Sequence, residues 1–258
     1  MRYENIRSIA GKILPVHARR WLKALWQQRW LRALRQRPPV GRVSFGSLDR
    51  VTPISRHFGI DRGCPIDRYY IENFLVQQAT DIRGRVLEVG DDSYTRRYGG
   101  SRVTKSDVLN VVEGNQKTTI VADLTRADHI PSDAFDCIIF TQTLQLIYDV
   151  RAAVRTLHRI LKPGGVLLAT FPGISQIAQD QWGEHWYWAF TTQSARRLFE
   201  ETFPAPNVEI EAHGNVLAAV SFLHGLAVEE LNKKELDRHE SAYEILITLR
   251  AVKPEATP

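Results

Sequence analysis

The chain has 258 residues, of which 43% are hydrophobic and 24% are charged. This length suits one sizeable α/β core with a modest appendage, and the composition is that of an ordinary soluble globular protein. The two cysteines are too few for a disulfide framework or a metal cluster, and Cys137 lies in the apolar run CIIF. We therefore expect a reducing compartment and no metal site.

The net charge of +5 is unevenly distributed along the chain. Residues 1–42 contain eleven Lys or Arg and one acid, Glu4, and so carry +10, which leaves −5 for residues 43–258. Basicity is thus a property of the N-terminal segment alone. No nucleic-acid partner is expected for the rest of the chain.

The first predicted element is a helix over residues 13–36, within a basic amphipathic arm at residues 1–42. Trp21, Trp26 and Trp30 share its apolar half with leucines and alanines. Basic residues interrupt this segment too often for a membrane-spanning helix, which needs ~20 apolar residues, or for a cleavable signal peptide. Two interpretations stay open: the arm lies on an anionic membrane surface, or it packs against its own domain or a second subunit.

Residues 43–83 are predicted to form an irregular connector that ends in a lid helix at 67–78. Pro38 and Pro39 stop the arm helix ahead of it. Three side chains near the start of the lid helix either cover a ligand or serve ordinary helix packing: Arg68, Tyr69 and Tyr70.

Residues 84–258 form the predicted main domain, in which strand-like and helical segments alternate. Five strands are expected, at 86–89, 102–106, 118–122, 135–140 and 165–171. Helices are expected at 150–161 and at 193–201, the second capped by Thr191 or Thr192. This alternation is typical of a parallel sheet with helices on both faces.

The last part of the chain departs from this alternation. Two further strands, at 207–212 and 243–251, flank one long predicted helix at 216–231. Alternating apolar residues in the final strand suit an antiparallel addition at the sheet edge. The expected fold class is therefore α/β: a doubly wound, Rossmann-like, seven-stranded and mostly parallel sheet with an antiparallel edge strand, plus the N-terminal helical arm.

Three of the predicted strands end in or just before an acid, namely Glu88, Asp107 and Asp123. In an open doubly wound sheet, ligands bind outside the carboxyl ends of the strands. Glu88 and Asp107 are 19 residues apart, close to the ~20-residue step at which such folds place a carboxylate on ribose hydroxyls. Since the two oxygens of a carboxylate can accept from both hydroxyls, the spacing favours a nucleoside-containing cofactor.

With these residues in place, the sequence resembles the class I S-adenosylmethionine-dependent methyltransferases, in particular their type 11-like small-molecule branch. The resemblance spans about residues 67 to 253 and depends on motifs in a fixed order. These are VLEVG at 86–90, Asp107 after the second strand, VADL at 121–124, FDCIIFTQTLQLIYD at 135–149 and LKPGGVLLATFPG at 161–173.

The resemblance assigns roles to the residues at the strand ends. Glu88 would face the methionine amino group of S-adenosylmethionine, and Gly90 would let the backbone approach the methionine portion. Asp107 would hold the ribose hydroxyls and Asp123 the adenine amino group. Residues that flank the ring or lie in the loop after the fourth strand complete the expected cofactor site: Val108, Leu124, Thr141 and Gln142.

One loop departs from the family pattern, in which an acid is followed by Gly-x-Gly-x-Gly. Gly90 is present, but Asp92 and Tyr94 occupy the second and third glycine positions, where a side chain hinders close approach and positive φ. Two explanations compete: the pocket is reshaped and Asp92 provides an extra polar contact to the cofactor, or cofactor binding has decayed. The first is preferred because all three strand-end acids remain.

Methyl transfer requires alignment of the acceptor and, for a hydroxyl acceptor, removal of a proton. The segment DQWGEHWYWAFT at 180–191 contains His185, a residue type that accepts protons near neutral pH. His185 is therefore the candidate catalytic base, and the alternative is that this Trp-rich segment only fills space. Its aromatic rings also suit a sugar acceptor.

The expected function is S-adenosylmethionine-dependent O-methyl transfer to a hydroxyl of a sugar or another small molecule. GIDRGCPIDRYYIENFL and GNVLAAVSFLHGLAVEEL resemble bacterial methyltransferases of glycan and surface-polysaccharide pathways. The expected location is cytoplasmic, peripheral at the inner membrane face if the arm binds anionic lipid or a partner enzyme. Two alternatives stay open: a non-catalytic scaffold of the same fold, and a nicotinamide-dependent oxidoreductase, for which the glycine fingerprint is missing.

Overall fold

The computed structural model describes residues 38–255, and the chain divides into a short first unit that ends at Val51 and a main unit that begins at Thr52. In the first unit, the described residues contain one short helical turn, Gly46–Leu48. The predicted arm helix at 13–36 lies outside the described residues. The boundaries expected at residues 42 and 83 remain predictions.

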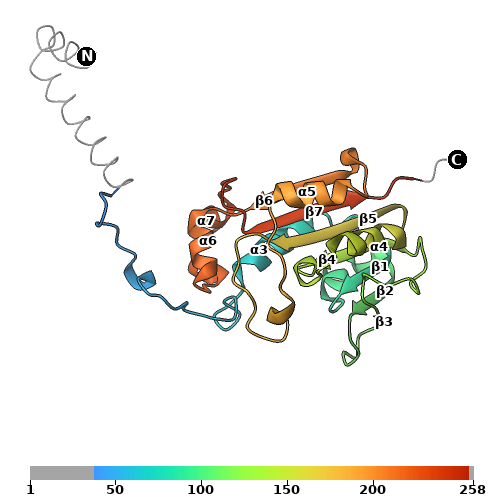
Figure 1. Ribbon diagram of the computed structural model, residues 1–258, viewed down its shortest axis with the longest axis horizontal. Coiled ribbons are helices and arrows are strands. Elements are labelled where there is room, and N and C mark those ends of the chain that lie inside the picture. Colours follow the sequence, from blue (N-terminus) through green and yellow to red (C-terminus); the bar gives the residue numbers. More distant parts are fainter. Residues whose placement is uncertain (1–37, 256–258) are drawn as a thin grey trace, which may run out of the picture. The chain divides into compact units, whose positions relative to one another are not determined.

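The main unit is built on one seven-stranded sheet (Figure 1). The strands are β1 Gly84–Val89, β2 Val103–Asn110, β3 Ile120–Val121, β4 Phe135–Thr141, β5 Leu161–Pro172, β6 Val208–His213 and β7 Leu246–Val252. Their order across the sheet is β3-β2-β1-β4-β5-β7-β6. All neighbouring pairs are parallel except those of β7, which runs antiparallel to both β5 and β6. The predicted Rossmann-like, mostly parallel sheet is confirmed. The antiparallel strand is β7, and β6 lies beyond it at the edge of the sheet.

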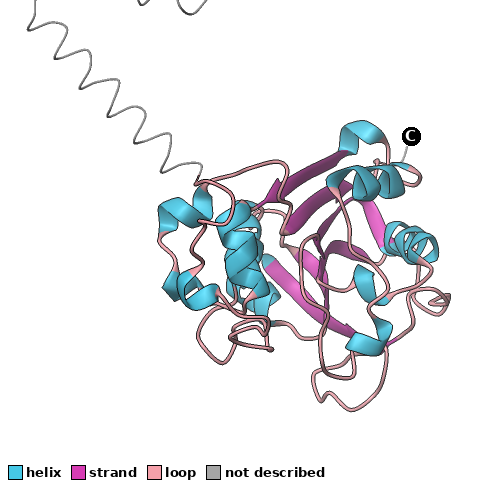
Figure 2. Ribbon diagram, turned by 60° about the vertical axis from the view of Figure 1, so that its left-hand side comes forward, coloured by secondary structure: helices cyan, strands magenta, loops and turns pink. Residues whose placement is uncertain are grey.

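Helices cover both faces of this sheet (Figure 2). They are α3 Ile66–Gln77, α4 Val150–Ile160, α5 Thr192–Glu200, α6 Val216–Leu223 and the short α7 Lys233–Asp237. Buried residues of α4 and α5 join one apolar cluster, and those of α3, α6 and α7 join a second. The expected lid helix, α3, therefore belongs to the core of the main unit.

The alternation of side chains along β4 shows how the sequence builds these two layers. Ile138 and Phe140 pack in the first cluster, and Cys137 and Ile139 in the second, because successive residues of a strand point to opposite faces. A strand buried on both faces is apolar throughout, which explains the uninterrupted run CIIF.

Side chains cap the starts of two helices, and the cap at Thr191 is the one expected from the sequence. Asp149 caps α4 by accepting from the backbone N–H of Ala152 at 2.9 Å. Thr191 caps α5 through a reciprocal pair of hydrogen bonds with Ser194. These caps define the residues at which α4 and α5 begin.

The long helix predicted at 216–231 is wrong, because α6 ends at Leu223. Gly225 adopts a φ of 70°, and a Cβ there would lie 2.3 Å from the backbone oxygen of Ser55. The chain turns at this glycine because only a residue without a side chain fits so close to the neighbouring segment.

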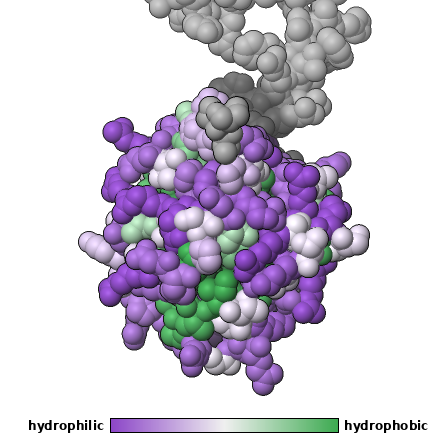
Figure 3. All heavy atoms as spheres, turned by 90° about the vertical axis from the view of Figure 1, so that its right-hand side faces the viewer, coloured by the Kyte–Doolittle hydropathy of each residue, from purple (hydrophilic) through white to green (hydrophobic). Residues whose placement is uncertain are grey.

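Several large apolar residues are exposed in the described part of the chain, among them Tyr148, Trp182 and Tyr187. Figure 3 shows a largely hydrophilic face interrupted by one compact hydrophobic patch. Within residues 38–255, no helix has the length and apolar character needed to cross a membrane.

Candidate active site

A cavity of about 1250 Å³ lies at the carboxyl ends of β1, β2 and β4. The sheet order reverses direction between β1 and β4, which is where doubly wound folds bind ligands. Of the ten predicted site residues, seven line this cavity: Glu88, Gly90, Asp123, Leu124, Thr141, Gln142 and His185. Asp92, Asp107 and Val108 do not line it.

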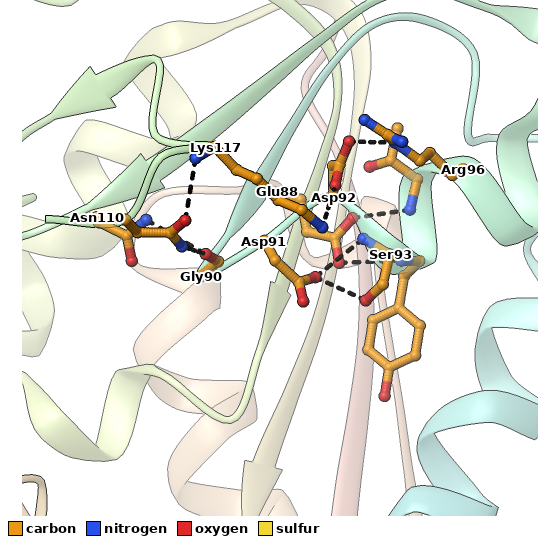
Figure 4. Close-up of polar contacts among 11 residues, drawn as sticks. Glu88, Gly90, Asp91, Asp92, Ser93, Arg96, Asn110 and Lys117 are labelled. Carbon is orange, nitrogen blue, oxygen red and sulfur yellow. Dashed lines mark hydrogen bonds and ion pairs between the residues drawn. The ribbon is translucent and has the colours of Figure 1, made fainter.

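Glu88 is a buried carboxylate that shapes the loop after β1. It is 2% exposed, and its two oxygens accept from the backbone N–H groups of Tyr94 at 3.1 Å and Thr95 at 2.7 Å (Figure 4). Burial raises the pKa of this carboxyl to about 7, although the hydrogen bonds around Thr95 act against the shift. Glu88 thus holds the chain in a turn that brings residues 90–94 back over the strand end.

Gly90 lies at the point where the chain leaves β1 for the cavity. Its φ is 91°, a value that side chains rarely tolerate. Its carbonyl accepts from the side-chain amides of Asn110 at 3.2 Å and Asn115 at 2.7 Å. Two amides from the β2 side therefore fix the position of this backbone.

Asp92 occupies the second glycine position and does not line the cavity. It is 5% exposed, accepts from Lys117 Nζ at 3.0 Å and pairs with Arg96 (Figure 4). Burial acts to raise its pKa, yet the hydrogen bonds from Lys117 and Arg96 hold that pKa below its usual value. Both cations bind this carboxylate, and the extra contact to a cofactor that we expect from Asp92 stays a prediction.

Tyr94 occupies the third glycine position and lines the cavity. Its hydroxyl accepts from Arg68 Nη1 at 2.8 Å, which ties the loop to α3. Among the lid candidates, Arg68 lines the cavity, whereas Tyr69 and Tyr70 bind Asp237 and the backbone oxygen of Leu236 at α7. Ordinary packing accounts for both tyrosines.

Asp107 lies within β2 and not at its end, because the strand continues to Asn110. Its carboxylate is 3% exposed and accepts from Arg85 Nε at 2.7 Å and from the Thr119 hydroxyl at 3.2 Å. This placement contradicts the expected strand end at residue 106 and keeps both Asp107 and Val108 out of the cavity. Asn110 lines the cavity instead. The apolar pair after Asp107 was the signal that the strand continues.

Asp123 and Leu124 follow β3 after one intervening residue, Ala122. Asp123 is exposed, and its Oδ1 accepts from the backbone and side chain of Thr125 at 2.9 and 2.8 Å. Leu124 is 3% exposed and adds apolar surface beside it. The pair thus offers a carboxylate next to an apolar wall.

The loops after β4 and β5 form the other half of the cavity. Gln142 adopts a φ of 47°, and its backbone N–H donates to Thr170 O at 3.0 Å. Gln145, which the sequence did not single out, is 1% exposed, and its backbone oxygen accepts from the backbone N–H of Tyr187 at 2.8 Å. These contacts connect the β4 loop to the segment after β5.

Four aromatic residues line this half of the cavity: Tyr148, Trp182, Trp186 and Tyr187. Trp188 stacks on Tyr148, and we call these five residues the aromatic rim. His185 lies in the same segment, is exposed, and has its Nδ1 3.5 Å from the Tyr187 hydroxyl. Within residues 38–255, no cluster of three or more His, Cys, Asp or Glu side chains could hold a metal ion.

The sequence matches the family described as "Methyltransferase domain" over residues 54–203, which is more than half of the chain. The chain belongs to this methyltransferase family. Membership confirms the expected class I methyltransferase with S-adenosylmethionine as its cofactor, and it argues against the nicotinamide-dependent alternative. The type 11 branch and the glycan association stay outside what this match shows.

Solved structures share the fold of this methyltransferase. A SAM dependent methyltransferase from Archaeoglobus fulgidus is 12% identical, with a TM-score of 0.50 over 72% of this chain and 94% of that chain. The N-methyltransferase NodS from Bradyrhizobium japonicum, in complex with S-adenosyl-L-homocysteine, is 16% identical, with a TM-score of 0.49 over 81% of this chain and 95% of that one. No curated protein matches the sequence.

Replacing Asp107 by asparagine should lower the free energy of unfolding by about 1 to 3 kcal/mol, because Arg85 loses a charged partner in a largely buried pair. Burial acts to raise the pKa of Asp107, yet Arg85 holds it below its usual value. Its contribution is therefore present above the unfolded-state pKa and is lost as pH falls through the folded-state pKa.

Urea unfolding of the wild type and the variant at about pH 7 and about pH 3 measures this effect, and the difference should shrink in acid. Asp128→Asn, at an exposed position, is the matched control and should change little. Equal stability of Asp107→Asn and wild type at neutral pH would contradict the ion pair.

Proposed function

We propose that this methyltransferase transfers a methyl group from S-adenosylmethionine to a hydroxyl of a sugar or another small molecule. One observation carries the proposal: a single cavity at the switch point joins a polar half, built by β1, β2 and β3, to a half surrounded by the aromatic rim. The first half suits a nucleoside, and the second suits a ring-shaped acceptor.

The residues of the first half fit the cofactor. The exposed Asp123 carboxylate can accept from the adenine amino group, with Leu124 against the ring. Asn110 replaces Asp107 as the residue placed to bind the ribose, since its Nδ2 donates to Gly90 O and Thr118 Oγ1 and its Oδ1 can accept from a hydroxyl. Glu88 and Gly90 shape the loop that faces the methionine portion. When bound, S-adenosylmethionine supplies a methyl group on a sulfonium that is a good leaving group.

His185 remains our candidate for the catalytic base. It lines the cavity within the aromatic rim segment, and its Nδ1 lies near the Tyr187 hydroxyl, which would orient the ring. Its free nitrogen would take the proton from an acceptor hydroxyl as the oxygen attacks.

The wider setting is also part of the proposal. A sugar acceptor on a glycan or a lipid-linked intermediate agrees with the aromatic rim, because aromatic faces pack against the C–H faces of sugar rings. The basic arm at residues 1–42 would then bring the enzyme to an anionic membrane surface or a partner enzyme on the cytoplasmic side.

Calorimetric titration of the full chain should show binding of S-adenosylmethionine and S-adenosylhomocysteine and no binding of NAD. Asn110→Ala should raise the Kd for S-adenosylhomocysteine about two- to tenfold, the effect of one lost hydrogen bond. Asp107→Asn is the control and should leave that Kd unchanged. Binding of NAD alone would refute methyl transfer, and binding of neither would favour a scaffold.

The Kd for S-adenosylmethionine should fall as pH rises from about 6 to 8, because Glu88 has a pKa raised to about 7 and only its ionised form attracts a cation. Calorimetry across this range measures the slope. Glu88→Gln should remove it, and a slope that persists in this variant would assign the titration to another group.

His185→Ala should reduce the rate of methyl transfer by about a hundredfold or more, as for the loss of a general base, with cofactor affinity intact. The assay uses tritium-labelled S-adenosylmethionine and a panel of neutral saccharides, on whichever member is methylated. Trp188→Phe is the matched control: it keeps an aromatic ring in the same segment and leaves His185 unchanged, so it should retain most of the activity. Full activity of His185→Ala would exclude it as the base.

A further inference from the structure

We propose that Gln145 and the aromatic rim bind an uncharged, hydroxyl-bearing ring as the methyl acceptor. Gln145 Oε1 accepts a hydrogen bond from an acceptor hydroxyl, and Tyr148 packs against the face of the ring. This inference rests on the proposed methyl transfer and adds to it the charge class of the acceptor and two residues that recognise it.

The first observation is a buried acceptor atom without a donor. Gln145 lines the cavity, and its Oε1 is buried with no hydrogen-bond partner in the described part of the chain. Its Nε2 donates to Gln142 O at 2.9 Å and lies 3.4 Å from Gln142 Oε1. Because Nε2 faces two oxygens, the amide cannot be turned around without placing oxygen against oxygen. Buried acceptors are normally satisfied, so a ligand that enters the cavity is the natural source of the donor.

The second observation is that strained backbone holds this amide in place. Gln142 has a φ of 47°, in the left-handed region that glycine favours, and such strain is concentrated at functional sites. Its N–H is held by Thr170 O, and its own carbonyl receives the Gln145 amide. The backbone oxygen of Gln145 in turn accepts from Tyr187 N. Gln145 thus joins the loop after β4 to the aromatic rim.

The rim itself offers exposed aromatic faces beside the cavity. Tyr148 is 71% exposed, and its ring centroid lies 6.0 Å from that of Trp188, with planes 30° apart. Tyr187 meets Tyr148 edge-on at 5.4 Å. Trp188 is fixed by its indole N–H, which donates to Ile147 O at 3.0 Å. Exposed apolar surface on fixed side chains at a cavity mouth indicates a binding surface.

The arrangement of these rings favours a sugar over an ammonium group. A cationic group is recognised by ring faces that surround it. Tyr148 stacks on Trp188 and meets Tyr187 edge-on, so these rings pack against one another and do not hold a guest between them. The exposed surface of the Tyr148 ring is instead open to the flat C–H face of a pyranose.

The charge of the cavity decides against phosphorylated acceptors. Seven carboxylates line it, from Asp67, Glu72, Glu88, Asp91, Asp123, Asp149 and Asp180, against three arginines, Arg68, Arg97 and Arg126. Arg97 is paired with Glu72 at 2.9 Å. Asp149 and Asp180 lie in the same loops as the rim, so a phosphate group attached directly to the reacting ring would be repelled there.

Saturation-transfer NMR on the full chain, loaded with S-adenosylhomocysteine, tests the acceptor class. The probes are the methyl glycosides of glucose, galactose, mannose and rhamnose, with choline and UDP-glucose as charged competitors. We expect saturation transfer, which reports binding, to at least one neutral glycoside and none to choline or UDP-glucose. Tyr148→Ala should weaken that glycoside about fivefold or more, and Gln145→Met about threefold or more.

Two controls separate the possible failures. Phe45→Ala changes an exposed ring outside the cavity lining and should leave glycoside binding intact. The Tyr148→Ala variant should fold as the wild type does, because the Tyr148 side chain is exposed. Calorimetry with S-adenosylhomocysteine reports the cofactor half independently, and loss of that binding in the wild type would refute the proposed function itself. If the cofactor binds but saturation transfer is seen to choline or to UDP-glucose, or to no glycoside, the proposed acceptor class is overturned. The proposed methyl transfer would still stand.

Discussion

The site depends on one interaction, the hydrogen bonds from the backbone of Tyr94 and Thr95 to the buried carboxylate of Glu88. A buried carboxylate is tolerated where it accepts from N–H groups, and it then dictates the course of the chain that supplies them. Here that chain is the loop after β1, which must curl back over its own strand. The cavity at the switch point exists because this loop is folded over the strand end and not extended away from it.

The same constraint explains how the loop dispenses with two glycines. In the family pattern, glycines let bare backbone approach a cofactor and adopt unusual φ values. Of the three residues at the glycine positions, Gly90, Asp92 and Tyr94, only Gly90 has a positive φ, and its carbonyl accepts hydrogen bonds from the side-chain amides of Asn110 and Asn115. Asp92 is bound by Lys117 on the neighbouring β2–β3 connection. Side-chain bonds to the adjacent loop thus hold this loop without the two glycines, and they favour our prediction of a reshaped pocket over decayed cofactor binding.

The sheet could be predicted from the sequence because its signal is the alternation of apolar segments, which burial on both faces imposes on β4 and β5. Glu88 and Asp123, expected at well-marked strand ends, line the cavity for the same reason, and their contacts to a cofactor stay predictions. Asp107 was misplaced because an acid inside β2 is paired with Arg85, and sequence alone does not show which cation a carboxylate meets. Gln145 was missed because its importance arises from the path of Gln142 and Tyr187, contacts between segments about 40 residues apart in the chain.

The two halves of the cavity are held by different kinds of contact, and this difference bears on how specificity can change. The β1–β3 half is fixed by charged and amide side chains that bind one another. The other half is fixed by backbone bonds, from Gln142 to Thr170 and from Tyr187 to Gln145, which do not depend on which side chains the rim presents. Rim residues can therefore be exchanged without loosening either the turn at Gln142 or the loop over Glu88. An enzyme built in this way can keep one cofactor site and take different acceptors by altering a few exposed aromatic residues.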